Sequence, residues 1–254
     1  MILFNIILFL FLLIDIKCQT KFRDIKKISL NNKYFVVLTS GLYLYNSKLL
    51  NCSLIYKFNS TIYNQTSDKI ILTKLEGENN SFILCLVSKY LFIYDAYNNK
   101  LNFYTINETN PFISPNYYNL LPYKINNDNL SFIFAFKNLT TYINFYYYIF
   151  NKISKKISKV KEYYFNLINI NDNIINCQIN SYFSYIKCFY YDHYDVNEHF
   201  LYSKTFLLED INIIENETNS YNLNESIIAV KSVLSSNNKF FICMPSGENK
   251  RIYF

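Results

Sequence analysis

One short pattern recurs five times along this chain at nearly even spacing, and no other feature of the sequence constrains the fold as strongly. In each copy a small or charged residue precedes an aromatic residue and a mostly apolar run, and the copies occupy residues 33–37, 81–85, 131–135, 184–188 and 239–243. The first residues of successive copies are 48, 50, 53 and 55 positions apart. A repeat of about fifty residues matches the length of a propeller blade, in which four strands form one sheet.

The composition favours strands throughout the chain. Its 254 residues include 26 Tyr and 23 Phe, but only 3 Gly and no Trp. Aromatic and β-branched residues suit a pleated, half-buried surface, and alanine, the best helix former, is nearly absent. We therefore predict an all-β, propeller-like fold with about five blade units of roughly 50 residues, the last of them incomplete.

Alternation of apolar residues and turn residues divides each unit into up to four short strands. The second unit shows this most clearly, with strands expected at 69–72, 81–85, 90–94 and 101–106. Acidic residues and two glycosylation sequons predict an exposed loop at 209–225. The fifth unit reaches Phe254 within its expected third strand. Either N-terminal residues supply its fourth strand, or the sequence is a fragment of a longer protein.

The N-terminal residues have the pattern of a signal peptide. Residues 1–14 form an apolar run that only Asn5 interrupts, which is too short to span a bilayer and has the length of a signal-peptide core. We expect a signal peptide at 1–18 and one propeller-like extracellular domain at 19–254. The alternative is a retained N-terminal membrane anchor. The expected location is secreted, or the extracellular face of the cell surface.

Sequons agree with passage through the secretory pathway. Nine asparagines lie in Asn-x-Ser/Thr with no proline between, a modest excess over chance, and several fall in the polar joints between apolar runs. The candidate glycosylation sites are Asn51, Asn59, Asn64, Asn79, Asn107, Asn129, Asn138, Asn216 and Asn224.

The cysteines are too few for a disulfide scaffold. Cys18 falls in the expected signal peptide, which leaves five of the 6 cysteines. Cys177 and Cys188 are a candidate disulfide across neighbouring strands, which an oxidising compartment permits. Cys85 and Cys243 share the repeat position of Cys188, and corresponding positions in different blades do not normally meet. We expect these two to be small buried hydrophobic residues.

The formal net charge of +6 has one concentration, a run of lysines at Lys152, Lys155, Lys156, Lys159 and Lys161. Two interpretations stay open. The lysines contact an anionic surface or glycan, or they form a solvated turn and an edge strand that their charge protects from pairing with another strand. A nucleic-acid partner is not expected of a secreted chain.

No strong catalytic or metal signature is present. The two histidines, His193 and His199, lie with three carboxylates in 192–199, but this spacing matches no metal motif, so we expect a polar loop. The chain has no G-x-S-x-G elbow, and its three glycines are scattered singly. We expect no catalytic, cofactor-binding or metal residues and no cofactor. A hydrolase with a carboxylate pair drawn from distant blades is the alternative.

The aromatic run at 145–148 alternates between two faces if it is a strand, and most of the 49 Tyr and Phe rings are expected in the core. The signal, the blade-length aromatic repeat and the sequon-rich joints resemble the extracellular β-propeller repeats of large surface proteins of protists. The chain lacks the Gly-His and Trp-Asp pairs of WD repeats and the double glycine of kelch repeats.

This resemblance implies a non-catalytic extracellular recognition or adhesion module of a secreted or cell-surface glycoprotein. Its expected partner is a protein or glycan ligand, and it meets a membrane only through an anchor outside this chain or a retained N-terminal segment. The alternatives are a secreted propeller-type hydrolase and a purely structural piece of a surface assembly.

Overall fold

The computed structural model describes residues 22–28, 33–38, 40–46, 51–59, 70–76, 81–87, 89–106, 117–137, 142–167, 175–180, 184–195, 198–223, 231–234, 240–246 and 249–253. For 22–28, 117–118, 175, 191–195, 198–199, 223 and the strands after residue 230, the description is of the backbone only. The expected signal peptide at 1–18 lies outside these residues. In the described part of the chain every regular element is a β-strand, and no helix there is long and apolar enough to cross a membrane.

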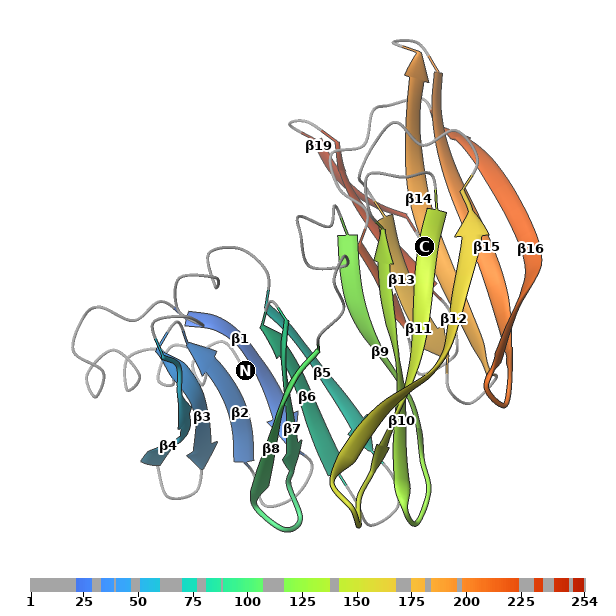
Figure 1. Cartoon of the computed structure of the whole chain (residues 1–254). Helices are drawn as coiled ribbons and strands as arrows, with labels where there is room; N and C mark the ends of the chain where they lie inside the picture. Colours follow the sequence, from blue (N-terminus) through green and yellow to red (C-terminus); the bar gives the residue numbers. More distant parts are fainter. Residues whose placement is uncertain are drawn as a thin grey trace. The chain divides into compact units, whose positions relative to one another are not determined.

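The chain divides into two compact units, Met1–Asn107 and Glu108–Phe254, and each is described by itself. The first unit contains two four-stranded sheets, formed by β1 (Phe22–Ile28), β2 (Lys33–Leu38), β3 (Gly41–Asn46) and β4 (Asn51–Lys57), and by β5 (Ile70–Glu76), β6 (Ser81–Val87), β7 (Tyr90–Asp95) and β8 (Lys100–Thr105). Figure 1 shows these strands in blue to green.

The second unit contains two four-stranded sheets and one sheet with three described strands. The four-stranded sheets are formed by β9 (Tyr117–Ile125), β10 (Asn129–Lys137), β11 (Tyr142–Asn151) and β12 (Lys156–Asn166), and by β13 (Ile175–Asn180), β14 (Tyr185–Asp195), β15 (Glu198–Glu209) and β16 (Asn212–Leu223). The last sheet is formed by β17 (Lys231–Leu234), β18 (Phe240–Ser246) and β19 (Asn249–Tyr253). In every sheet each strand pairs antiparallel with the next one along the chain.

The recurring sequence pattern marks the second strand of each sheet. Its five copies fall on β2, β6, β10, β14 and β18, which confirms the expected blade units, and the fifth unit has three strands among the described residues. All seven residues of β6 are buried. A strand with neighbours on both sides and covered faces has no solvent side, so its sequence is an unbroken apolar run and not an alternation.

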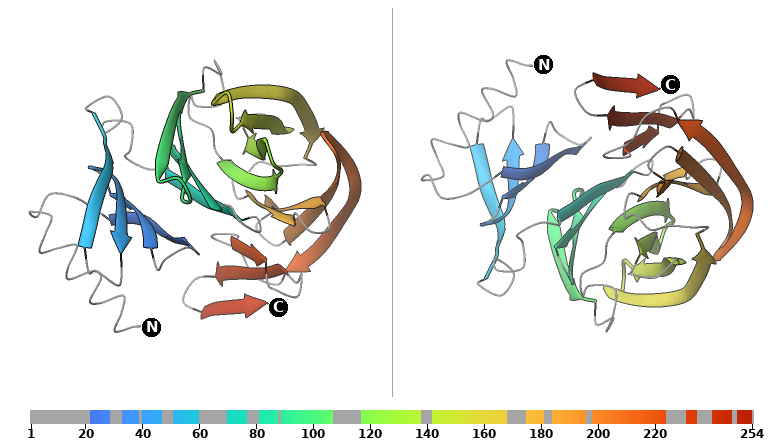
Figure 2. Two further views of the ribbon diagram at one scale, coloured as in Figure 1. Left: turned by 90° about the horizontal axis from the view of Figure 1, so that it is seen from below. Right: turned by 90° about the horizontal axis from the view of Figure 1, so that it is seen from above.

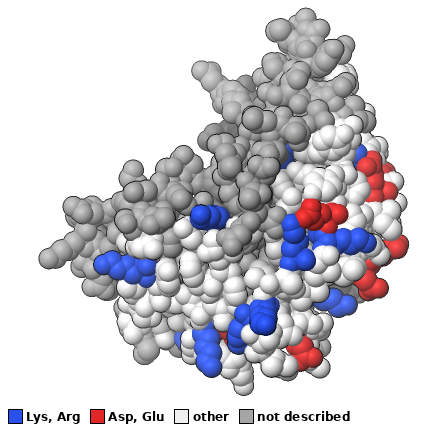
Figure 3. All heavy atoms as spheres, viewed as in Figure 1, with Lys and Arg blue, Asp and Glu red and all other residues white. Residues whose placement is uncertain are grey.

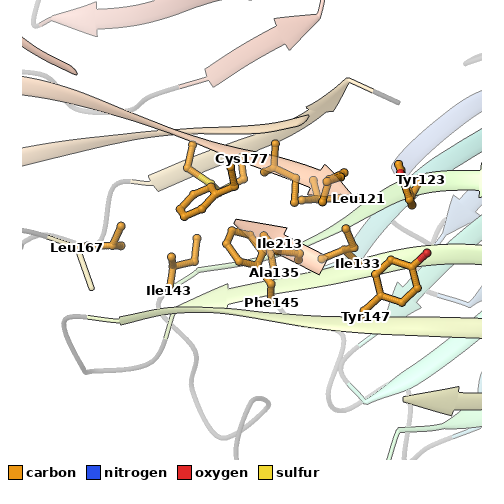
Figure 4. Close-up of a cluster of buried hydrophobic side chains, with 14 of the residues drawn as sticks. Leu121, Tyr123, Ile133, Ala135, Ile143, Phe145, Tyr147, Leu167, Cys177 and Ile213 are labelled. Atoms are coloured by element: carbon orange, nitrogen blue, oxygen red, sulfur yellow. A yellow bond between two sulfur atoms is a disulfide. The ribbon is translucent and has the colours of Figure 1, made fainter. Parts of the chain in front are cut away.

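Within each unit the two four-stranded sheets pack face to face, as propeller blades do. In the first unit Val37 of β2 lies in one buried cluster with Ile83 and Cys85 of β6. In the second unit Ile133 of β10 lies in another with Cys177 of β13 (Figure 4). Figure 2 shows the sheets of the second unit as successive layers. The expected all-β, propeller-like fold is confirmed.

The prediction of a loop at 209–225 is wrong, because residues 212–223 form the long strand β16. This strand pairs with β15 from Glu209↔Asn212 to His199↔Leu223. It was missed because an outermost strand has a neighbour on one side only and can be polar on both faces. Of the polar loop expected at 192–199, the described residues belong to the ends of β14 and β15, where Asp195 pairs with Glu198.

Candidate interaction surface

The first and fourth strands of each four-stranded sheet have a neighbouring strand of that sheet on one side only, and we call the fourth the outermost strand. Three of these four strands, β4, β12 and β16, hold one extra residue relative to the neighbouring strand. The register shifts place these bulges at Ile55, Val160 and Asn216. A bulge bends an edge strand and interrupts its ladder, which discourages pairing with another chain.

All five lysines of the expected cluster lie on the β11–β12 hairpin. Lys152 and Lys155 are in the turn, and Lys156, Lys159 and Lys161 are on β12. The Asn151 side chain builds this turn, because its Oδ1 accepts hydrogen bonds from the backbone N–H of Ile153 (3.1 Å) and of Ser154 (2.7 Å). Asparagine favours turns through such local bonds.

β12 is the last strand of its sheet, so the lysines lie on an edge strand, as one of the two interpretations expects. Four of the five are also exposed, so this position is compatible with contact to an anionic ligand. Lys159 and Lys161 have polar partners within the protein. Lys159 forms an ion pair with Glu162 and lies over the ring of Tyr146, with Nζ 4.5 Å from the centroid. Lys161 Nζ donates to Asn212 Oδ1 at 2.6 Å. In Figure 3, blue and red atoms lie next to one another on the right-hand part of the molecule.

Exposed apolar groups lie among these charges. Ile153 at the turn is 77% exposed, Val160 at the bulge 41% and Tyr164 near the end of β12 57%. We define the β12 surface as the exposed residues Ile153, Lys155, Lys156, Lys159, Val160, Lys161, Glu162 and Tyr164. Such a combination of cations with an aromatic ring suits an anionic or sugar-like ligand.

Hydrogen bonds hold Tyr164 and Glu162 in place. The Tyr164 hydroxyl donates to Glu162 Oε2. The hydrogen bond from Lys159, and then that from Tyr164, lowers the pKa of Glu162. The bond to Glu162, followed by one with Tyr146, raises the pKa of Tyr164. The Tyr164 ring is therefore fixed through its hydroxyl while its body remains exposed.

A buried lysine that the sequence analysis missed fastens β12 to the next sheet. Lys204 on β15 is 4% exposed, and its Nζ donates to the carbonyl oxygen of Asn166 at 2.7 Å and pairs with Glu215 at 2.8 Å. The Tyr163 hydroxyl adds a bond to the carbonyl oxygen of Ile211 at 2.9 Å. The only sequence signal was a lysine inside an apolar strand, and such a charge is buried only with partners.

The structure describes the side chains of some of the predicted cysteines and of neither histidine. Cys177 and Cys188 are register partners on β13 and β14, both fully buried, and a disulfide of 1.99 Å joins them (Figure 4). Cys85 is buried, as expected. The side chains of Cys243 and of both histidines lie outside the described residues. Among the side chains that are described, no three of His, Cys, Asp and Glu gather as a metal site.

Four of the nine sequon asparagines lie in the described part of the chain. Asn51, Asn59 and Asn216 are exposed, and Asn129 is half-buried. The other five candidates, Asn64, Asn79, Asn107, Asn138 and Asn224, lie outside it. Whether any of the nine carries a glycan stays a prediction.

The aromatic run at 145–148 belongs to the core. Its four rings are between 0% and 8% exposed. Phe145 and Tyr147 pack toward the β13–β16 sheet. On the opposite face Tyr148 stacks on Phe132 of β10, and Tyr146 meets Phe136 of β10 edge to face. The alternation expected for a strand is present, and no ring of the run is open to a ligand.

Comparisons with known proteins give no family. No protein-family model and no curated protein matches this chain. Among solved structures, the WD40 domain of SCAP from fission yeast is 12% identical, with a TM-score of 0.48, and the match covers 92% of this chain and 62% of that one. The complex of the fission yeast SREBP and SCAP binding domains is 11% identical, with a TM-score of 0.47, and the match covers 93% of this chain and 73% of that one. Kluyveromyces lactis Hsv2 is 8% identical, with a TM-score of 0.41, and the match covers 92% of this chain and 63% of that one. The chain thus spans less than two thirds of the first and third of these structures. The propeller-like fold is assigned from the order and pairing of the strands and not from these similarities.

Proposed function

We propose that this chain is a non-catalytic extracellular recognition or adhesion module of a secreted or cell-surface glycoprotein, and that the β12 surface binds a polyanionic glycan. One observation carries the proposal, namely that the lysine run lies on a single outer hairpin beside exposed apolar groups. At neutral pH the four lysines and one glutamate of the β12 surface leave a net charge of +3 (four minus one).

The spacing of the lysines suits a ligand with repeated negative charges. Lys156, Lys159 and Lys161 lie along about 15 Å of edge strand at the rise of a β-strand. Lys159 is on one face of β12 and the other two are on the opposite face, so a ligand that runs along the edge can reach all three. A sulfated or carboxylated polysaccharide presents charges at comparable intervals along a flexible chain. The exposed Tyr164 ring offers a flat apolar face on which a sugar ring can stack.

The β12 surface is held in place before any ligand arrives. Tyr163 donates to the β15–β16 turn and Lys161 to the first residue of β16. Lys204 donates to the carbonyl oxygen of Asn166 at the end of β12. A fixed backbone reduces the entropy lost on binding, since only the ends of the lysine side chains must be ordered.

Two further features support the extracellular part of the proposal. The buried Cys177–Cys188 disulfide is of a kind that persists in oxidising compartments and is rare in the cytosol. Three sequon asparagines in the described part of the chain are exposed, so a glycan at those positions meets solvent.

Binding of the secreted full chain to a sulfated polysaccharide tests the proposal. The substitution K155N/K156Q removes two charges of the β12 surface, and asparagine tolerates the positive φ of 55° at position 155. We expect affinity to fall about 5- to 30-fold, since each exposed charge contributes about 0.5–1 kcal/mol. Affinity for the wild-type chain should also fall as salt is added.

The matched control removes two exposed lysines from other outermost strands, Lys57 on β4 and Lys100 on β8. The control K57Q/K100Q changes the net charge equally and should bind as the wild type does. An equal loss of affinity in both variants would show non-specific attraction. Release of shorter products from the polysaccharide would instead favour the secreted hydrolase.

A further inference from the structure

The edge of β16 is the longest outermost edge in the described part of the chain and carries exposed apolar groups. β16 pairs with β15 over eleven residue pairs on one side, and it ends its sheet on the other. Ile214 and Tyr221 are each 44% exposed, and Ile211 before the strand is 37% exposed. A long edge strand with exposed apolar residues is a site at which a second copy of the chain can pair.

β16 lacks the charge that protects β12. β12 carries three lysines at its edge, whereas β16 has no lysine, and one of its two glutamates, Glu215, is already paired with Lys204. Natural sheets protect long edges by charge, bulges, proline or a covering group. The bulge at Asn216 interrupts the middle of β16 and leaves its two halves open to pairing.

Asn216 is placed to carry a covering group. Thr205 pairs with Glu217 and Phe206 pairs with Glu215, so Asn216 has no register partner on β15. Asn216 and Thr218, the two defining residues of its sequon, are both exposed. A glycan on this asparagine projects from the edge without displacing any residue of the ladder.

Asn129 provides the contrast within the same unit. Its Oδ1 accepts a hydrogen bond from Asn151 Nδ2 at 3.1 Å, and Ser131 of the same sequon is buried in the inner strand β10. A glycan on Asn129 would disturb the start of a central strand. Of these two positions, the fold accommodates a glycan at Asn216.

We infer that Asn216 is N-glycosylated and that this glycan keeps the chain monomeric by covering the free edge of β16. The amide nitrogen of Asn216 loses a proton and forms a bond to the anomeric carbon of an oligosaccharide, which leaves its polyprenyl diphosphate carrier. The inference rests on the extracellular location in the proposed function. It assigns to β16 a protection that lysines provide at β12.

Glycopeptide mass spectrometry and sedimentation of the full chain from a eukaryotic secretory host test the inference. T218A removes the sequon, and T218S is the matched control that keeps it. We expect a glycan at Asn216 in the wild type and T218S, and a concentration-dependent dimer or larger species in T218A only. Trimming of the glycan on the folded wild-type protein with an endoglycosidase, which leaves one sugar and adds no charge to Asn216, should give the same species, which separates edge exposure from misfolding.

A second variant tests the mechanism. T218A/S220K lacks the sequon but places a lysine at an exposed position on the same edge, opposite Tyr202. It should be monomeric without a glycan, because the lysine charge replaces the sugar as the barrier. Association of this variant to the same extent as T218A would overturn the edge mechanism.

Two outcomes separate this inference from the proposed function. An unmodified Asn216 in a chain whose Asn51 is modified, or a monomeric T218A, overturns the inference alone. Absence of glycans at every sequon overturns both the inference and the extracellular location. Binding to a sulfated polysaccharide is measured independently and does not depend on Asn216.

Discussion

Truncation of Phe206 tests the face-to-face packing of the two four-stranded sheets in the second unit. Phe206 on β15 is fully buried, and its ring centroid lies 5.0 Å from that of Phe145 on β11 and 4.7 Å from that of Phe165 on β12. The variant F206A therefore removes a side chain of the β13–β16 sheet that packs against the β9–β12 sheet. Its loss leaves a cavity between them, because neither sheet can move inward as a whole.

Truncation of a buried phenylalanine costs about 3–5 kcal/mol, and each ring pair accounts for about 0.5–1.5 kcal/mol of such a loss. At a urea m-value of about 2 kcal/mol/M, the unfolding midpoint of F206A should fall by roughly 2 M. Urea titration followed by circular dichroism and tyrosine fluorescence measures this shift, and the chain has no Trp to obscure the tyrosine signal.

The control is Y97A, which removes an aromatic ring that is 66% exposed in a turn. Its effect should stay within about 0.5 kcal/mol, as for most surface substitutions. If F206A shifts the midpoint no more than Y97A does, the two sheets do not pack as described, and the reasoning from the buried cluster is refuted.

Three further predictions concern single interactions of the second unit. Reduction of the Cys177–Cys188 disulfide, or C177A/C188A, should lower the free energy of unfolding by about 3 kcal/mol for a loop of this length, and a reductant that leaves the wild-type midpoint unchanged would contradict the bond. K204M should lower the free energy of unfolding by about 1–3 kcal/mol, because the carbonyl group of Asn166 loses its donor. The exposed control K156M should leave it nearly unchanged, and equal effects of the two variants would show that Lys204 does not fasten β12. The lowered pKa of Glu162 stabilises the folded protein at pH values above the ordinary pKa of 4.5, and this stabilisation is lost as the pH falls through the lower pKa of the folded state. E162Q should therefore flatten this part of the curve of unfolding free energy against pH, and an unchanged curve would argue against the ion pair with Lys159.

The sequence located the inner strands well because burial on two faces leaves a strong pattern. β6 and β10 are apolar along nearly their whole length, and their copies of the repeat set the phase of every blade unit. The candidate pairing of Cys177 with Cys188 rested on their expected positions on neighbouring strands. Inner strands are thus specified by their own residues.

The outer strands were harder to locate because their neighbours, and not their own residues, decide their structure. β16 has only one buried residue among those from Asn212 to Asn222, namely Ile213, and its acidic residues and sequons suggested a loop. Pairing with β15 supplies the strand geometry that β16 does not encode by alternation. The role of Lys204 was missed for a similar reason, since its partners Asn166 and Glu215 are distant in sequence.

Hydrogen exchange of the full chain with and without a sulfated polysaccharide tests most directly whether the β12 surface is the contact site. We predict slower exchange of backbone amides in 152–161 when the ligand is bound, with β4 and β8 unchanged. Protection confined to other strands at saturating ligand, or no protection at 152–161, would contradict it.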